Sequence, residues 1–156
     1  DRSPSRGLGD VYKRQLFDRI LDKTIPSHKV AEGEYWYAFL DIFPRREGHT
    51  LVIPKQSVRR LSELSQSMRE ALFNGVVEVQ QILSTHFETE DFTVCIHDGP
   101  LAGQEVPHVH VHVIPRNAED GGLTLQSMWP EAPPLGGNAD HDSLGSLSAQ
   151  LQEVKQ

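Results

Sequence analysis

The chain has 156 residues, of which 37% are hydrophobic and 24% are charged, and its formal net charge at pH 7 is -7. This length supports one sizeable core rather than two ordinary domains, and the negative charge argues against a broad surface for nucleic acid. Cys95 is the single cysteine and has no partner for an intramolecular disulfide, and no apolar run approaches the roughly 20 residues of a membrane span. We therefore expect a soluble, cytoplasmic protein with no nucleic-acid or membrane partner.

The first 15 residues, DRSPSRGLGDVYKRQ, show neither helical nor strand periodicity, and we leave them out of the fold prediction. They look like a translated sequencing adapter, and a native, disordered basic leader is the alternative. From residue 16 onward the pattern predicts one domain that ends at Trp129. An extension with a weak helical pattern follows over residues 130–156.

Periodic apolar segments predict the elements of the domain. Spacings of three and four predict a short helix over residues 16–22 and a long helix over residues 61–87, whose stripe from Met68 to Phe87 would cover one face of a sheet. Short β-rich runs predict strands over residues 30–32, 35–40, 50–53, 92–97 and 108–114. The predicted class is α+β, with about five antiparallel strands and one long helix across them.

Three histidines alternate with three valines in residues 108–113. Because successive side chains of a strand point to opposite faces, this period of two places His108, His110 and His112 on one face and the valines on the other. One face is then free for chemistry while the other packs. The loop before this segment contains Gly99 and Gly103, which let backbone N–H groups approach an anion closely and so favour a phosphate cradle.

These motifs resemble those of the histidine-triad (HIT) superfamily of nucleotide hydrolases and transferases. HVHVHVI at residues 108–114 matches its His-x-His-x-His pattern, and GHTLVIP at residues 48–54 resembles the strand that carries a fourth histidine, His49. Residues 98–116 resemble the dinucleoside polyphosphate hydrolase branch, which includes fragile-histidine-triad-like proteins. IPS at residues 25–27 instead resembles the nucleoside phosphoramidase branch and its bacterial relatives, so the chain looks like a bacterial-type HIT hydrolase with features of both.

The resemblance implies a covalent mechanism and a nucleotide site. His110 would attack the α-phosphorus and become a transient nucleotidyl-histidine, and His112 would hydrogen-bond phosphate and leaving-group oxygens. His108 would orient the nucleophile, and His49 would support it. The implied nucleotide and phosphate contacts are Asp41, His97, Gly103, Gln104, Phe17, Ile20, Phe39, Ile42 and Leu51. Core packing would use the same apolar residue types equally well.

Two other uses of the histidines stay open. Histidines two residues apart on a strand can bind zinc, but no Asp, Glu or Cys partner stands in a matching motif. Phe17 and Asp18 also occupy the place of the Cys pair found in some zinc-bearing bacterial relatives. We therefore expect no resident metal and no required cofactor, with a divalent ion only as a substrate counter-ion. The second alternative is a nucleotide-binding or regulatory module without turnover, against which the intact His110 argues.

Two residues depart from the pattern of the family. His97 stands where relatives usually have Asn or Gln, and Glu105 stands where they commonly have a small hydroxyl residue. Both changes lie on the implied leaving-group side, so the pattern leaves both a phosphoramidate and a dinucleoside polyphosphate open as the substrate. The partners that the resemblance implies are a purine nucleotide and a second copy of the chain, in a homodimer with a continuous sheet.

Overall fold

The computed structural model describes residues 16–122, 124, 127–132 and 136–154. The predicted leader over residues 1–15 lies outside the described residues. The chain divides into two compact units, and the division falls between Asp120 and Gly121. The domain boundary at Trp129 that the sequence pattern suggests stays a prediction.

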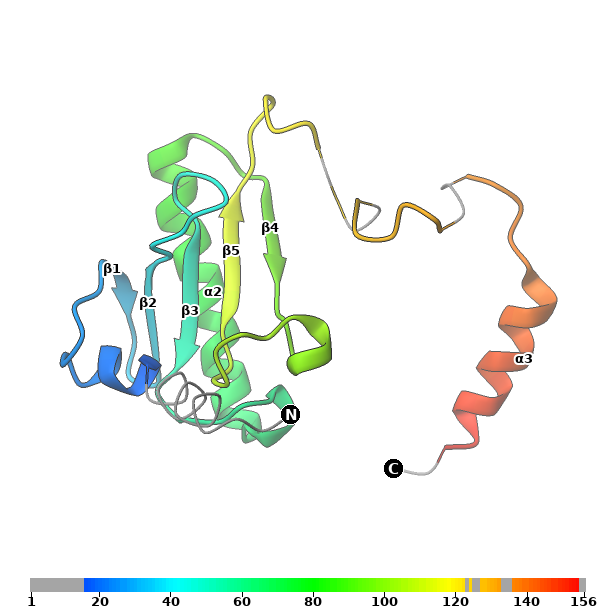
Figure 1. The fold of residues 1–156 in the computed structure, drawn as a ribbon, viewed down its shortest axis with the longest axis horizontal. Helices are drawn as coiled ribbons and strands as arrows, with labels where there is room; N and C mark the ends of the chain where they lie inside the picture. Colours follow the sequence, from blue (N-terminus) through cyan, green and yellow to red (C-terminus); the bar gives the residue numbers. More distant parts are fainter. Residues whose placement is uncertain (1–15, 123, 125–126, 133–135, 155–156) are drawn as a thin grey trace, which may run out of the picture. The chain divides into compact units, whose positions relative to one another are not determined.

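The first unit is built on a five-stranded antiparallel sheet with strand order β1-β2-β3-β5-β4 (Figure 1). Its strands are β1 (Lys29–Glu32), β2 (Trp36–Leu40), β3 (Thr50–Pro54), β4 (Phe92–Cys95) and β5 (Val111–Pro115). The first three strands follow one another along the chain, whereas β5 inserts between β3 and β4. This arrangement confirms the predicted α+β class and the five-stranded sheet.

The long helix α2 (Gln66–Phe87) crosses one face of this sheet, as Figure 1 shows. The middle of its predicted stripe is buried against the sheet, and Met68 and Phe87 pack at the edge of the same cluster. The buried stripe residues are Leu72, Val76, Val79 and Leu83. Burial of four such side chains contributes on the order of 1.5–3 kcal/mol each, so this stripe anchors the helix.

The long helix begins later than the pattern predicted. Leu61–Glu63 form a separate 3-10 turn, η1, and Leu64 then takes an extended conformation that interrupts the helix. Ser65 caps α2, because its hydroxyl accepts a hydrogen bond from the backbone N–H of Met68 at 3.3 Å. Periodicity alone missed this start, since the apolar spacing continues through the turn while the local capping chemistry sets the first helical residue.

The opposite face of the sheet carries the histidines. A second buried cluster covers it, formed by Phe17 and Ile20 from the short helix at residues 16–21 together with Phe39, Leu51 and Ile53 from the sheet. Val109, Val111 and Val113 point to the α2 side, where each is at most 1% exposed. The predicted separation of valines and histidines onto two faces is therefore present.

The histidine segment is only partly a strand. β5 begins at Val111, so His108 and His110 precede the strand, and His108 lies in a bend. The backbone N–H of Val109 donates to the carbonyl of Val58 at 2.8 Å, which ties these residues to the segment that follows β3. The predicted strand over residues 92–97 likewise ends at Cys95, two residues before His97.

The second unit contains α3 (His141–Gln152), which Asp140 caps by accepting from the N–H of Ser143 at 3.1 Å. Its apolar residues Leu144, Leu147 and Leu151 are exposed within this unit. Across the described chain, no helix combines the length and the apolar character that crossing a membrane requires.

Candidate active site

Five imidazoles gather on the histidine face of the sheet. The β3–β5 ladder pairs Leu51 with His112, and this register brings His49, at the start of β3, beside a residue 63 positions away in the sequence. The ring centroids of His112 lie 5.1 Å from those of His49 and His110, and 5.2 Å from that of His97. His112 is therefore the centre of the cluster.

The ring of His110 is held by a backbone contact. Its Nδ1 lies 2.7 Å from the carbonyl oxygen of His108, and a carbonyl can only accept, so Nδ1 carries the proton. In the neutral ring the lone pair is then on Nε2. The sequence-based expectation assigned this orienting role to His108, and the structure shows that its carbonyl provides the contact.

The contacts of His49 set the protonation of His112. The backbone N–H of Arg45 donates to Nδ1 of His49 at 3.1 Å, so the proton of the neutral His49 ring is on Nε2. Nε2 of His49 lies 2.9 Å from Nδ1 of His112 and donates to it. The proton of His112 is consequently on Nε2, which makes that atom a hydrogen-bond donor in the site. His49 thus contacts His112 directly. Its expected role in supporting the nucleophile stays a prediction.

His108 is the most buried of the cluster, with no exposed surface. Its Nε2 donates to the carbonyl of Pro54 at 3.0 Å, which leaves Nδ1 as a buried acceptor without a hydrogen-bond partner in the described part of the chain. Asp18 Oδ1 lies 3.8 Å from this nitrogen. Sequence reasoning missed Asp18 as a neighbour of the site, although it directly follows Phe17.

Burial keeps these imidazoles neutral. Desolvation lowers the pKa of His49, His108 and His110 below the ordinary value of 6.5. For His112, desolvation and then the neighbouring rings of His110, His49 and His97 lower the pKa to about 4. Near pH 7 each of these rings therefore keeps a nitrogen lone pair, which a nucleophile requires.

Asp41 lies at one end of the histidine cluster. Its Oδ1 accepts from the N–H of Phe43 at 2.8 Å, while its Oδ2 lies 3.6 Å from Nε2 of His49. Its neighbour Ile42 is 70% exposed and is free to contact a ligand. The ribose role assigned to Asp41 from the sequence stays a prediction.

Four of the five apolar residues predicted as nucleotide contacts lie together. Phe17, Ile20, Phe39 and Leu51 all belong to the buried cluster on the histidine face, and each is at most 8% exposed. The ring of Phe17 meets those of His110 and His108 edge to face, at centroid distances of 5.2 and 5.5 Å. These residues therefore pack as core, and Phe17 also borders His110. Their contact with a base stays a prediction.

The glycine loop joins the cluster at His97. Gly99 and Gly103 have φ values of +110° and +93°, which side chains of L-residues rarely adopt. A Cβ built on Gly103 would lie 3.4 Å from Nδ1 of His97, so the loop passes directly over that ring. Gln104 donates from Nε2 to the carbonyl of Arg59 at 2.8 Å, and its role in holding phosphate oxygens stays a prediction. In this structure its amide nitrogen fixes the loop.

One group of three ligand atoms among the described residues could hold a metal ion. It comprises Asp41, His49 and His112, whose atoms lie within 4.8 Å of one another. The sequence showed no carboxylate partner for the histidines in a matching motif, and the fold supplies one in Asp41. The two nitrogens, however, already share a proton at 2.9 Å, so an ion would have to replace that hydrogen bond.

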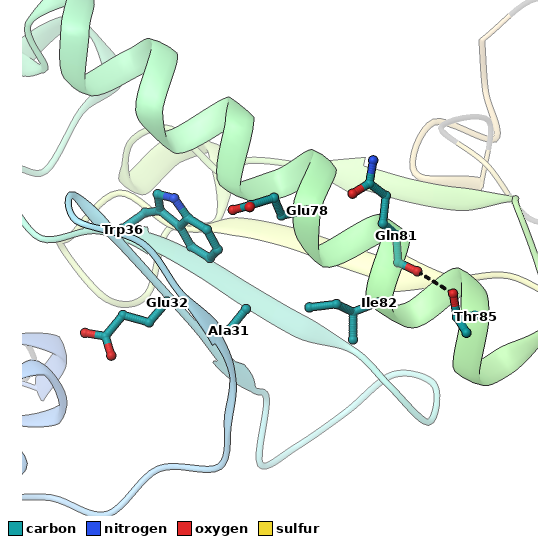
Figure 2. Close-up of a pocket in the computed structure, with 7 residues that line it drawn as sticks. All are labelled: Ala31, Glu32, Trp36, Glu78, Gln81, Ile82 and Thr85. Atoms are coloured by element: carbon teal, nitrogen blue, oxygen red, sulfur yellow. Dashed lines mark hydrogen bonds between the residues drawn. The ribbon is translucent and has the colours of Figure 1, made fainter.

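A groove of about 520 Å³ lies away from the histidines, between β1 and α2 (Figure 2). Glu32 and Glu78 line it together with Trp36 and Ile82, and Thr85 donates to the carbonyl of Gln81 beside it. It contains no histidine or cysteine. This groove therefore lacks the nucleophilic side chains that the histidine cluster provides on the opposite face of the sheet.

Comparison with known proteins gives consistent matches. The HIT domain matches residues 22–119. Adenosine 5'-monophosphoramidase HNT1 of Saccharomyces cerevisiae is 35% identical over 136 residues, which cover 87% of this chain and 79% of that protein. Bis(5'-nucleosyl)-tetraphosphatase (asymmetrical) of Schizosaccharomyces pombe is 46% identical over 83 residues, which cover 53% of this chain and 46% of that protein.

The fold comparison agrees with the sequence matches. The crystal structure of SMU.412c from Streptococcus mutans has a TM-score of 0.75 to this chain at 34% identity, covering 88% of this chain and 83% of that one. The domain match spans more than half of the sequence and includes His49, His97 and the three alternating histidines. The chain belongs to the HIT domain family.

Proposed function

We propose that this protein is a nucleotide hydrolase that cleaves a purine nucleoside phosphate derivative through a covalent nucleotide on His110. The observation that carries the proposal is the 2.7 Å contact from Nδ1 of His110 to the carbonyl of His108, which leaves Nε2 as the unprotonated nitrogen. The names of the relatives support it, since one is an adenosine 5'-monophosphoramidase and another a bis(5'-nucleosyl)-tetraphosphatase.

In the first step, Nε2 of His110 attacks the α-phosphorus. A bond forms between this nitrogen and phosphorus, and the bond from phosphorus to the leaving group breaks with its electron pair going to the leaving group. The ring becomes a phosphorylated imidazolium, and the His108 carbonyl that accepts from Nδ1–H stabilises its positive charge. In the second step water attacks phosphorus, releases a proton, and the nucleoside monophosphate departs from a neutral His110.

His112 acts on the charge that develops during both steps. Its Nε2–H is the donor that the contact with His49 fixes, so it stabilises a phosphate or leaving-group oxygen. Because its pKa is lowered to about 4, His112 is a neutral donor across the physiological range. Its effect should be largest for poor leaving groups, which need the most help to depart.

Trapping the adduct tests this proposal. Incubation with diadenosine tetraphosphate or adenosine 5'-phosphoramidate, followed by rapid quenching and mass spectrometry, should show one nucleotidyl group on His110. His110→Ala should abolish both the adduct and turnover while it largely spares binding of adenosine monophosphate. His28→Ala removes an exposed imidazole and serves as the control. Full turnover by His110→Ala, or turnover lost to a chelator and restored by zinc, would contradict the covalent mechanism.

We further propose that two copies of the chain pair into a homodimer. β4 is an edge strand with the exposed residue Val94, and α2 exposes Phe73 and Val77. Light scattering that shows only monomer at working concentration would contradict the pairing.

A further inference from the structure

Among the described residues, two adjacent arginines near the histidines, Arg59 and Arg60, have no carboxylate within ion-pair distance. Within residues 16–122 no carboxylate forms an ion pair within 4.0 Å of Arg59 or Arg60, although the chain has 22 acidic and 15 basic residues. Nε of Arg59 is buried without a hydrogen-bond partner there. A buried donor without an acceptor is costly, so this corner favours an added anionic oxygen.

Arg59 lies next to the nucleophile segment. Val58, the preceding residue, accepts the backbone N–H of Val109 at 2.8 Å, and Val109 stands between His108 and His110. The carbonyl of Arg59 accepts from Gln104, which belongs to the glycine loop, at 2.8 Å. The arginine pair is therefore tied both to the histidine segment and to the loop that precedes it.

Arg60 covers the other end of that loop. A Cβ built on Gly99 would lie only 2.6 Å from Nη1 of Arg60, so the guanidinium occupies the space that a side chain would fill. The loop then runs from Gly99 to Gly103, which lies against His97, and the ring of His97 lies 5.2 Å from that of His112. The guanidinium of Arg60, the glycine loop and the histidine cluster are therefore linked by a continuous series of contacts.

Two of the nearby carboxylates, those of Glu63 and Asp98, are engaged with backbone groups. Oε1 of Glu63 accepts from the backbone N–H of Arg60 at 3.0 Å, and Oδ1 of Asp98 accepts from that of Leu61 at 3.1 Å. Both acids therefore hold the backbone of η1 and its flanks, and the guanidinium groups keep their donors for another anion.

We infer that Arg60, with Arg59 behind it, binds the phosphates of the leaving group, so that this site takes dinucleoside polyphosphates. This inference rests on the proposed function. The leaving group of a dinucleoside polyphosphate is a nucleoside oligophosphate, whose anionic oxygens match the planar fork of a guanidinium. The leaving group of a simple phosphoramidate carries no phosphate, so Arg59 and Arg60 do not stabilise it.

Two substrates with the same adenylyl group test the inference. Arg60→Gln should lower kcat/KM for diadenosine tetraphosphate by about tenfold, the usual scale for one charge-assisted hydrogen bond, and leave kcat/KM for adenosine 5'-phosphoramidate unchanged. Arg60→Lys should recover part of the loss. Lys29→Gln makes the same charge change on β1 at the far edge of the sheet and should leave both substrates unaffected.

Binding provides a second readout. In a His110→Ala background, calorimetry should show that adding Arg60→Gln weakens diadenosine tetraphosphate about tenfold and leaves adenosine monophosphate unchanged. An equal loss for both substrates, or no loss for either, would overturn the inference. So would a wild-type protein that cleaves the phosphoramidate alone. Failure of the wild type to cleave either substrate or to form the His110 adduct would instead overturn the proposed function, and this inference with it.

Discussion

Replacing His49 with alanine tests whether the contacts of the cluster set the state of His112. His49 is 3% exposed, donates to Nδ1 of His112 and accepts from the N–H of Arg45. His49→Ala removes both hydrogen bonds, at about 0.5–1.5 kcal/mol each, and leaves a small cavity. We expect the free energy of unfolding to fall by about 2–4 kcal/mol in total.

The same change should raise the pKa of His112. Burial first, and then the neighbouring rings, including that of His49, hold this pKa at about 4. Removing one ring and admitting water weakens both causes, so His112 should titrate closer to 6.5. Its proton should also no longer be confined to Nε2, so turnover of substrates with poor leaving groups should fall more than turnover of those with good ones.

NMR titration of the ring nitrogens measures the pKa and the position of the proton directly, and chemical denaturation measures the stability. His28→Ala is the matched control, because that imidazole is exposed and the backbone carbonyl of His28, which accepts from the N–H of Leu40, is kept in the variant. A His112 that stays neutral down to pH 4 in His49→Ala, or a stability loss no larger than that of the control, would refute the reasoning.

Acidification from pH 7 to pH 5 should lower the free energy of unfolding. The buried histidines have lowered pKa values in the folded state, whereas histidines of the unfolded chain bind protons near pH 6.5. Acidification therefore stabilises the unfolded state relative to the folded state. Denaturation curves that show constant or rising stability would contradict this. Gly75→Ala should destabilise the first unit by about 1–2 kcal/mol, because its Cβ would lie 2.5 Å from Trp36 and the overpacking exceeds the gain in helix propensity. The Cβ added by Gly145→Ala meets nothing within 4 Å, so this variant should raise the helicity of α3, as measured by circular dichroism. If Gly75→Ala were the stabilising variant and Gly145→Ala the destabilising one, that result would contradict tight packing at Gly75.

Several features of the molecule follow from local sequence alone. The alternation through His112 sends histidines to one face and valines to the other, because the pleat of extended chain has a period of two. The apolar stripe from Met68 to Phe87 predicts α2, because helical neighbours recur every three to four residues. Both rules depend only on the geometry of the backbone, and both hold in the structure.

The boundaries needed information that periodicity does not carry. The helix starts at Gln66 because Ser65 caps it and Leu64 is extended, although the apolar spacing reaches back to Leu61. The strand starts at Val111 because the ladder with β3 begins there, so His110 precedes the strand. A helix cap and a strand ladder each depend on which particular backbone and side-chain groups form hydrogen bonds with one another.

The chemistry of the cluster was decided by the tertiary structure. The sequence identifies His49, His110 and His112 as candidates, yet only the β3–β5 register places Nε2 of His49 at 2.9 Å from Nδ1 of His112 and so fixes which nitrogen carries each proton. The same holds for Arg59 and Arg60, which are two ordinary basic residues until the fold brings them to the glycine loop. Protonation and charge pairing depend on contacts between residues far apart in the chain, and such contacts exist only once the sheet has formed.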